Sequence, residues 1–208
     1  MKPNLKKGEW LLLIFNLLVI IGFTIYYGSI KNYEFMIYIG VIIFFFVLIL
    51  ATLKRSKFDY IILAGLSLWA FFHMAGGGVK VGSGVLYGVQ LIPIINHGEL
   101  VIFKFDQFVH AFGFGVSTLI AWHLIKPYLN EKTNYKIVYP LIALVGMGLG
   151  ALNEIIEFTA VVLIPETGVG GYYNTALDLV FNMFGAITAI IFIHFREKQK
   201  PIKRLNKK

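Results

Sequence analysis

The sequence predicts an all-α membrane protein, a polytopic bundle of about six transmembrane helices. Of its 208 residues, 58% are hydrophobic and only 14% are charged, whereas a soluble domain carries close to a quarter charged residues. Apolar stretches long enough to cross a bilayer recur along the whole chain. The basic residues gather at the chain ends and in alternate connections, as membrane topology requires. The chain has no cysteine, which excludes disulfides, thiolate chemistry and sulfur-ligated zinc sites.

Each span is expected to be helical, because lipid offers the backbone no hydrogen-bond partners. The expected spans are residues 10–27, 35–53, 59–76, 104–125, 137–163 and 175–195. The first is interpreted as a retained helix rather than a cleaved signal, because it is long and no small-residue cleavage site follows it. The fifth exceeds the ~20 residues that a crossing needs, so its last turns are expected to stand above the membrane or to be irregular. No repeat or second domain is evident, and residues 1–208 are expected to form one integral membrane domain.

The basic residues predict the orientation. Sixteen of the nineteen Lys and Arg fall in the N-terminal segment, residues 54–57, residues 126–136 and the tail 196–208. Lys31, Lys80 and Lys104 are the other three. This split predicts cytoplasmic N- and C-termini in a multi-pass protein of the cell membrane. The net charge of +8 is therefore interpreted as a topology signal, with a tail that rests on anionic lipid heads, and no nucleic-acid partner is expected.

The connection 77–103 differs from the other loops. It contains six glycines and Pro93, yet it is rich in aliphatic residues. It is too apolar for an ordinary loop and too interrupted for a helix. We expect a short folded outer cap, with a hairpin, in which the glycines form turns rather than an anion-binding cradle.

Polar residues inside the expected spans are the candidates for function. A charge at the bilayer centre costs at least ~2.5–3.5 kcal/mol on insertion scales, so such residues are functional candidates by default. They are His73, Asp106, His110, Asn153, Glu154, Glu157, Asp178 and Asn182. With the predicted topology, all of them fall in the outer half of the membrane.

Helical spacing places these residues on shared faces, because positions three or four apart are neighbours on a helix. Asp106 faces the same way as His110, and the same holds for Asp178 and Asn182. Each polar pair is followed inward by small residues, which let membrane helices approach closely. The pattern predicts a tight seam between the last three helices, with a polar chamber at its outer mouth. His73 of the third helix is expected at the same level.

The charge balance predicts an occupant for this chamber. Its four carboxylates are expected to have no basic side chain beside them, since Lys104, two residues from Asp106, is expected to point elsewhere. Clustered carboxylates in a low-dielectric site must hold protons, a cation or both. Histidine together with carboxylates suits zinc, manganese or iron, and a site dominated by oxygens suits magnesium or calcium. The alternative interpretation is a structural hydrogen-bond network that locks the helices together.

At these residues the chain resembles the YjdF-like family of bacterial inner-membrane proteins. The motifs are Phe72-His73-Met74-Ala75-Gly76-Gly77, Asp106-x-x-x-His110-x-x-x-Phe114-Gly115, Asn153-Glu154-x-x-Glu157 and Tyr173-Asn174-Thr175-x-x-Asp178, leading to Gly185-Ala186. The Asp-x-x-x-His and Asp-x-x-x-Asn-x-x-Gly elements are more distantly similar to VanZ-like membrane proteins, which are linked to glycopeptide-antibiotic resistance.

The resemblance implies a fold and important positions but no reaction. The family pattern commonly has Arg where this chain has Gln107, which removes a possible counter-charge. Where the family tends to have acidic residues, this chain has Gly171 and Asn174, so a wider acidic rim is not expected.

Three functions remain open. The first is an outward-facing enzyme acting on a lipid or cell-envelope precursor, in which one divalent metal ion activates water. Asp106, His110 and Glu157 are its preferred ligands, Asp178 and His73 are further candidate ligands, and Glu154 is the candidate general base. Asn153 and Asn182 are expected to support these groups. The second is a non-catalytic envelope scaffold or partner protein. The third is a proton- or cation-coupled carrier, which would need polar groups along a whole path.

Overall fold

Six long helices form the body of the protein in a computed structural model that describes residues 5–98, 100–164 and 167–198. They are α1 (Lys7–Ser29), α2 (Tyr33–Ser56), α3 (Tyr60–Gly78), α4 (Phe105–Ile125), α5 (Tyr135–Leu163) and α6 (Tyr172–Lys198). All six are long and apolar enough to cross a membrane. The predicted six-helix, all-α architecture is confirmed, and every predicted end lies within three residues of the observed one.

Side-chain caps define where several helices begin. The Asn32 side chain accepts a hydrogen bond from the Phe35 N–H at the start of α2, and Asp59 accepts one from the Ile62 N–H at the start of α3. Asn134 plays the same part at α5. Such caps satisfy backbone donors that have no partner within the helix. The fifth span is a regular helix of 29 residues, about 43 Å long at 1.5 Å per residue, so the irregularity considered for its last turns is not observed.

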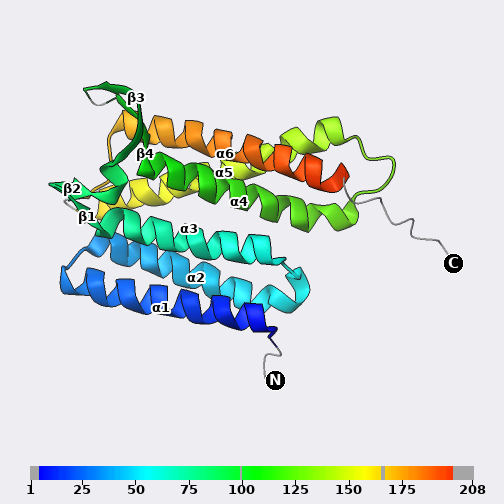
Figure 1. Cartoon of the computed structure of the whole chain (residues 1–208), viewed down its shortest axis with the longest axis horizontal. Coiled ribbons are helices and arrows are strands. Elements are labelled where there is room, and N and C mark those ends of the chain that lie inside the picture. The colour runs from blue at the N-terminus through cyan, green and yellow to red at the C-terminus, as the bar shows by residue number, and fades with distance from the viewer. Residues whose placement is uncertain (1–4, 99, 165–166, 199–208) are drawn as a thin grey trace.

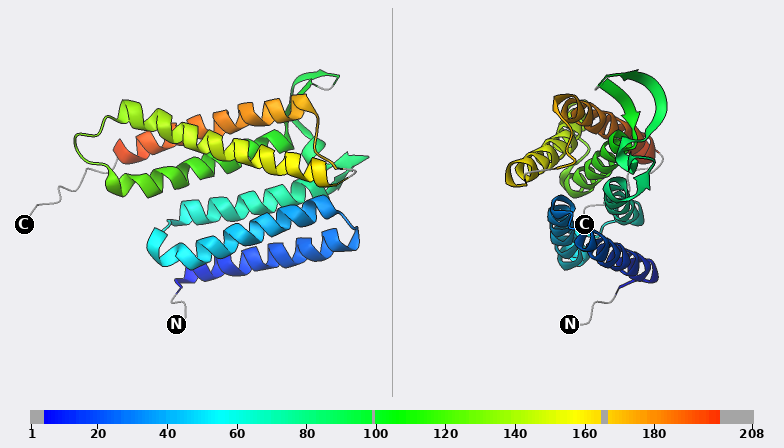
Figure 2. Two further views of the ribbon diagram at one scale, coloured as in Figure 1. Left: turned by 180° about the vertical axis from the view of Figure 1, so that it is seen from behind. Right: turned by 90° about the vertical axis from the view of Figure 1, so that its left-hand side faces the viewer.

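The helices form two groups of three, α1–α3 and α4–α6, which lie one above the other in Figure 1 and in the end view of Figure 2. The first group is held by a buried cluster near the cap that includes Tyr27, Phe35, Tyr38 and Met74. A smaller cluster around Trp122 stabilises the opposite end of the second group. α3 and α4 are the main contact between the groups.

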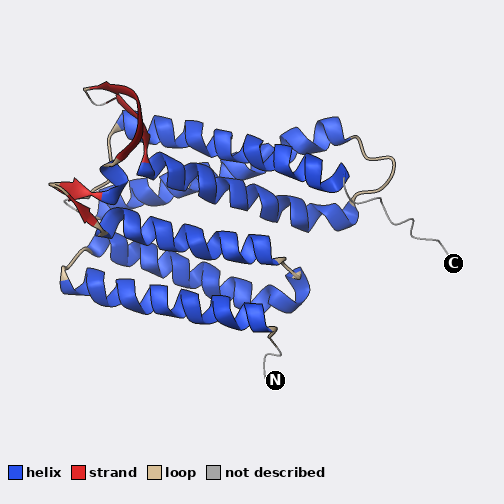
Figure 3. Cartoon of the chain, in the orientation of Figure 1, coloured by secondary structure: helices blue, strands red, loops and turns tan. Residues whose placement is uncertain are grey.

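The predicted cap is present and contains two antiparallel hairpins. β1 (Lys80–Val81) pairs with β2 (Gly84–Val85), and after a short 3₁₀ turn β3 (Gln90–His97) pairs with β4 (Leu100–Lys104). All four strands lie at one end of the bundle (Figure 3). Gly82 and Gly98 have φ of +59°, a left-handed conformation that glycine adopts without steric cost. These two glycines therefore serve the turns, as the sequence predicts.

Small residues bring α4, α5 and α6 into close contact. A Cβ at Gly185 of α6 would overlap the carbonyl oxygen of Ala111 in α4, and one at Gly146 of α5 would overlap the Thr118 hydroxyl. The predicted seam between the last three helices is therefore observed. Gly113 is an exception, because it faces the Trp69 ring of α3 instead.

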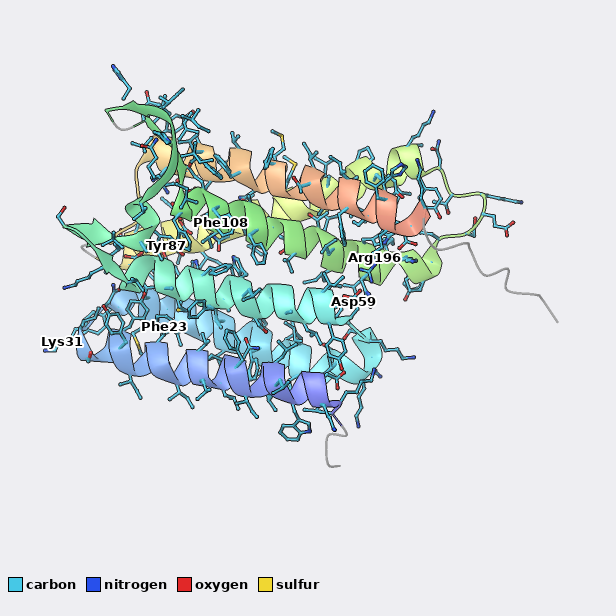
Figure 4. All side chains as sticks on the ribbon, viewed as in Figure 1. Phe23, Lys31, Asp59, Tyr87, Phe108 and Arg196 are labelled. Atoms are coloured by element: carbon cyan, nitrogen blue, oxygen red, sulfur yellow. The ribbon has the colours of Figure 1, made fainter. Side chains whose placement is uncertain are left out.

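The start of α1 and the end of α6 lie at the end of the bundle opposite the cap (Figure 1). There Arg196 of α6 donates to Asp59 at 2.8 Å and links the two groups of helices (Figure 4). Burial raises the pKa of Asp59, but the Ile62 N–H and the Arg196 guanidinium outweigh it, so that the net pKa is lower than usual. Of the basic tail, residues 199–208 lie outside the described residues.

Candidate functional site

The candidate site is a polar chamber centred on His110, where α4, α5 and α6 meet near the cap. His110 comes from the second turn of α4 and is only 5% exposed. Its Nε2 lies 3.9 Å from Asp106 Oδ1 and 4.0 Å from Glu157 Oε1, and its Nδ1 lies 3.5 Å from Glu154 Oε1. Asp106 and His110 belong to α4, whereas Glu154 and Glu157 belong to α5. Residues more than forty positions apart in sequence therefore share one site.

Helix α6 supplies the other side of the chamber. Asp178 and Asn182 are both fully buried, and Asn182 Oδ1 lies 3.1 Å from His110 Nδ1. A proton on Nδ1 would be donated to this amide oxygen, which leaves Nε2 unprotonated and directed toward Asp106 and Glu157. In metal-binding histidines, a hydrogen bond from the ring nitrogen that does not bind the metal sets the tautomer in this way.

Asn174 in the first turn of α6 organises the two aspartates. Its Nδ2 donates to Asp178 Oδ2 at 2.6 Å and to Asp106 Oδ2 at 3.3 Å. The Oδ1 atom of each carboxylate is left for another ligand. On α5, Asn153 donates in the same way to Glu157 Oε1 at 2.8 Å. The amides thus hold three of the four acids without adding charge.

Three buried polar atoms of the chamber have no hydrogen-bond partner. They are Glu154 Oε1, Asp178 Oδ1 and Asn182 Nδ2. A buried polar group without a partner costs about 1–3 kcal/mol, and more if it is charged. Two of these atoms are carboxylate oxygens, the preferred ligands of hard cations.

Two sets of side chains, which share His110, have ligand atoms within 4.8 Å of one another: Asp106 with Asp178, and Glu154 with Glu157. Ligand atoms at about 2.1 Å from one zinc-sized ion are at most about 4.2 Å apart. The separations of His110 Nε2 from Asp106 and from Glu157 are within that limit. The residues present therefore fit a divalent cation in donor type, and these two separations fit it in spacing.

The structure corrects the expectation for Lys104. Lys104 precedes α4, as its N-cap residue with an extended backbone, so helical spacing does not govern its direction. Its Nζ donates to Asn174 Oδ1 at 2.6 Å. The positive charge of Lys104 therefore lies at the rim of the chamber. The Asn174 amide connects it by hydrogen bonds to Asp106 and to Asp178.

Gln107 has a structural role. Its side chain is fully buried; it accepts hydrogen bonds from the Phe103 and Lys104 N–H groups and donates to the Val101 carbonyl. These bonds join β4 to the first turn of α4. They position Lys104 and Asp106 rather than supplying charge.

The structure does not bring His73 into either set of candidate ligands. Its Nδ1 contacts Tyr87 Oη at 2.5 Å, and its ring stacks on Trp69 with centroids 5.5 Å apart. Tyr87 belongs to the cap and also donates to the His73 carbonyl. Burial raises the pKa of Tyr87 well above its usual range, and the carboxylate of Asp106 adds to that rise. Tyr87 therefore remains a neutral hydrogen-bond donor that fastens the cap over α3.

Sequence reasoning missed Glu34, a buried acid at the start of α2. Its Oε2 accepts a hydrogen bond from the Gly168 N–H at 2.6 Å, and its Oε1 lies 3.4 Å from the Tyr38 hydroxyl. Glu34 thus ties the first helix group to the connection between α5 and α6. Glu34 lies one residue before the predicted span 35–53, so the rule that singled out acids inside the spans did not reach it.

Comparison with known proteins places the chain in a family. Residues 9–199 match the family model described as "Predicted membrane protein (DUF2238)". The chain belongs to this family. The match covers all six helices and the cap, and agrees with the resemblance to YjdF-like membrane proteins. Neither the curated proteins nor the solved structures give a match. As a member of the DUF2238 family the chain is a protein of the lipid bilayer, and the chemistry of its chamber has to be argued from the side chains.

Proposed function

We propose that this protein is a membrane enzyme whose chamber binds one divalent cation and cleaves a bond in a lipid or envelope precursor by hydrolysis. The observation that carries the proposal is the arrangement around His110. Asn182 and Asn174 occupy Nδ1 of the histidine and one oxygen of each aspartate. Asp178 Oδ1 and Glu154 Oε1 are left without a partner in a buried site, where a cation would satisfy them.

Asp106, His110 and Asp178 are the ligands that this arrangement favours. Asp178 takes precedence over Glu157 because its Oδ1 is fully buried without a partner, whereas the Glu157 Oε1 that faces the histidine already accepts from Asn153. Glu157 is available as a fourth ligand. A cation held by two carboxylates and one imidazole would supply Lewis acidity and lower the pKa of a bound water.

Glu154 is suited to the role of general base. It is 8% exposed, its Oε1 lacks a partner, and it lies on the α5 side of the histidine, within 3.5 Å of Nδ1. A carboxylate in this position could take a proton from an attacking water. Removing Glu154 should therefore reduce turnover more than it reduces cation binding.

The substrate class follows from location. The chamber lies at the membrane end that carries the cap, opposite the basic end, so the positive-inside rule assigns it to the outer face and both termini to the cytoplasm. A substrate that reaches a site between membrane helices must itself partition into the bilayer. A lipid or a lipid-linked envelope precursor has that property.

Metal analysis of the purified protein tests the proposal. We expect about one equivalent of a transition metal per chain, or stoichiometric binding of added Zn²⁺ or Mn²⁺ to the purified apoprotein. His110→Ala and Asp178→Asn should lose at least nine-tenths of that binding. Glu154→Gln should retain the metal.

His123→Ala is the matched control, because His123 lies at the opposite end of α4 and its Nε2 contacts the Ser56 carbonyl. It should bind metal like the wild type. Size-exclusion chromatography would confirm that each variant is folded. A wild-type protein that binds neither Zn²⁺ nor Mn²⁺, or a folded His110→Ala protein that binds as much as wild type, would overturn the proposal and favour a purely structural network.

A further inference from the structure

An apolar groove runs between α2, α3, α4 and α5, below the chamber. It has a volume of about 580 Å³. Its walls consist mainly of aliphatic and aromatic side chains, such as Phe45, Leu66 and Ile120. Trp69, Gly113 and Asn153 line it near the chamber, and Arg55 and Ser56 line it at the basic end.

The length of the groove matches one leaflet of a membrane. On α4 its lining extends from Gly113 to Leu124, about 16 Å at 1.5 Å per residue. Half of the ~30 Å hydrocarbon core is about 15 Å. Since α2 to α5 are all long enough to span the bilayer, the groove lies within the leaflet next to the basic end.

The two ends of the groove differ in charge. Arg55 lies at the basic end, close to where α2 terminates, and among the described residues it takes part in none of the ion pairs, which join Lys126 to Glu197 and Arg196 to Asp59. The opposite end is closed by Asn153, whose amide is engaged with Glu157. An occupant with a negative group at one end and hydrocarbon along its length would complement both features.

We propose that the groove is a binding site for one acyl chain of an anionic phospholipid, with the phosphate on Arg55. Hydrocarbon is the medium that surrounds membrane helices, and it fills an apolar groove without the penalty that water or an ion would meet there. The headgroup phosphate would give the site its selectivity through a charge-assisted contact with the guanidinium. This proposal does not depend on metal binding in the chamber.

The bound chain would also support the chamber from below. Asn153 belongs to both places, since it lines the groove and donates to Glu157. An acyl chain against this residue would limit the entry of water between the groove and the carboxylates. A site of this kind differs from the surrounding lipid shell in having one position and a preferred headgroup.

Native mass spectrometry of the detergent-purified, delipidated protein tests this site. The probes are dioleoyl phosphatidylglycerol and dioleoyl phosphatidylcholine, added separately at equal concentration. We expect one phosphatidylglycerol to be retained by the wild type in preference to phosphatidylcholine. Arg55→Gln should reduce that preference about fivefold, the ratio that ~1 kcal/mol per basic residue near a membrane surface corresponds to. Ser117→Trp, which fills the groove from α4, should abolish retention of both lipids.

Two controls separate this site from general lipid association. Lys54→Gln removes a neighbouring charge that does not line the groove, and Leu144→Trp places the same side chain on the exposed face of α5. Both should retain lipid like the wild type. Equal retention of the two lipids by the wild type, or an equal effect of Lys54→Gln and Arg55→Gln, would refute the proposal. Because Arg55 is exposed, its variant keeps the test informative even if Ser117→Trp does not fold.

Discussion

Neutral amide side chains lie between the ionisable side chains of the chamber and orient them. Asn174, Asn182 and Asn153 each contact a carboxylate or the histidine through a hydrogen bond. An amide donates without contributing a charge, so it can orient a carboxylate while leaving the carboxylate's charge for a ligand. Lys104 is connected to the carboxylates only indirectly, through its hydrogen bond to Asn174.

At the same scale, Tyr87→Phe tests the attachment of the cap. The variant loses the hydroxyl that contacts His73 Nδ1 and the His73 carbonyl. We expect the free energy of unfolding to fall by about 1 kcal/mol, the usual net value of one hydrogen bond, as measured by thermal unfolding in detergent. Tyr128→Phe is the control, because Tyr128 is 81% exposed. If the two variants had the same unfolding temperature, the Tyr87 hydroxyl would not be what holds the cap on α3.

Local spacing predicted the chamber residues that lie on one helix and failed where the backbone leaves the helix. The pairs Asp106–His110 and Asp178–Asn182 share a face by helical periodicity, and the structure places them together. Lys104 escaped prediction because an N-cap residue does not follow that periodicity. His73 has the right depth, but the rings of Tyr38 and Tyr87 beside it come from other elements, and no local pattern reveals them.

Helix pairing in the second group depends on glycine. Gly185 of α6 packs against the Ala111 carbonyl of α4, and Gly115 of α4 packs in turn against Gly185. Membrane helices gain no hydrophobic free energy from one another, so close backbone contact is their main source of association. The chamber requires this contact, because Asn182 must reach His110 from the adjacent helix.

Gly185→Ala should therefore destabilise the protein. The added methyl group overlaps backbone atoms that cannot move aside as a side chain would, and we expect a loss of about 1–3 kcal/mol, typical of overpacking. Gly148→Ala is the matched control, since a Cβ there meets nothing within 4 Å. Thermal unfolding of both variants in the same detergent would check this, and a Gly185→Ala protein as stable as the control would contradict the tight α4–α6 contact.

The Asp59–Arg196 pair gives an element-scale prediction with a pH dependence. The pKa of Asp59 is lower in the folded state than in the unfolded chain, so its contribution to stability is present above the unfolded value, about 3.9, and is lost as pH falls through the folded value. Asp59→Asn keeps a helix cap and removes the ion pair.

Since both partners are about one-third exposed, we expect Asp59→Asn to lower stability by no more than ~1 kcal/mol at pH 7. The difference from wild type should shrink below pH 4. Denaturant unfolding at pH 7 and pH 3 would measure it. A difference that grows on acidification would mean that the pair is not the origin of the effect.

Among the elements, the helices were predictable and the details of the cap were not. Apolar length alone determines a membrane span, which is why the predicted ranges agree with α1–α6. The pairing of β3 with β4 includes a register shift between Gln90 and Ile95, and Phe103 has φ of +70°, an uncommon conformation for a residue with a side chain. Phe103 is held by a hydrogen bond from its N–H to the Gln107 side chain and by stacking on Phe181, contacts that the sequence does not predict.

At the scale of the whole molecule, the two ends of the bundle carry different features. The cap and the chamber lie at one end, and the start of α1, the end of α6 and two inter-helix ion pairs lie at the other. The groove that extends from below the chamber to the basic end of the bundle has apolar walls. A continuous route for ions would need polar side chains along its length, so this feature favours the enzyme over the carrier.

The absence of cysteine makes the proposed orientation directly testable. Single variants Ser83→Cys, in the β1–β2 turn, and Lys132→Cys, in the connection between α4 and α5, place one thiol at each end of the bundle. In intact cells, a membrane-impermeant maleimide should label Ser83→Cys and leave Lys132→Cys unlabelled until the membrane is permeabilised. The reverse pattern would place the chamber on the cytoplasmic side.

The order in which the ribosome releases the helices has a consequence for the chamber. Asp178, Asn174 and Asn182 all belong to α6, which is synthesised after α1 to α5. Until α6 inserts, His110 and Asp106 are without their amide partners and the glycine face of α4 is open to lipid. During synthesis the polar groups of α4 and α5 therefore precede the amides that neighbour them in the folded protein. Insertion of α6 is the step that gives His110 and Asp106 their amide partners.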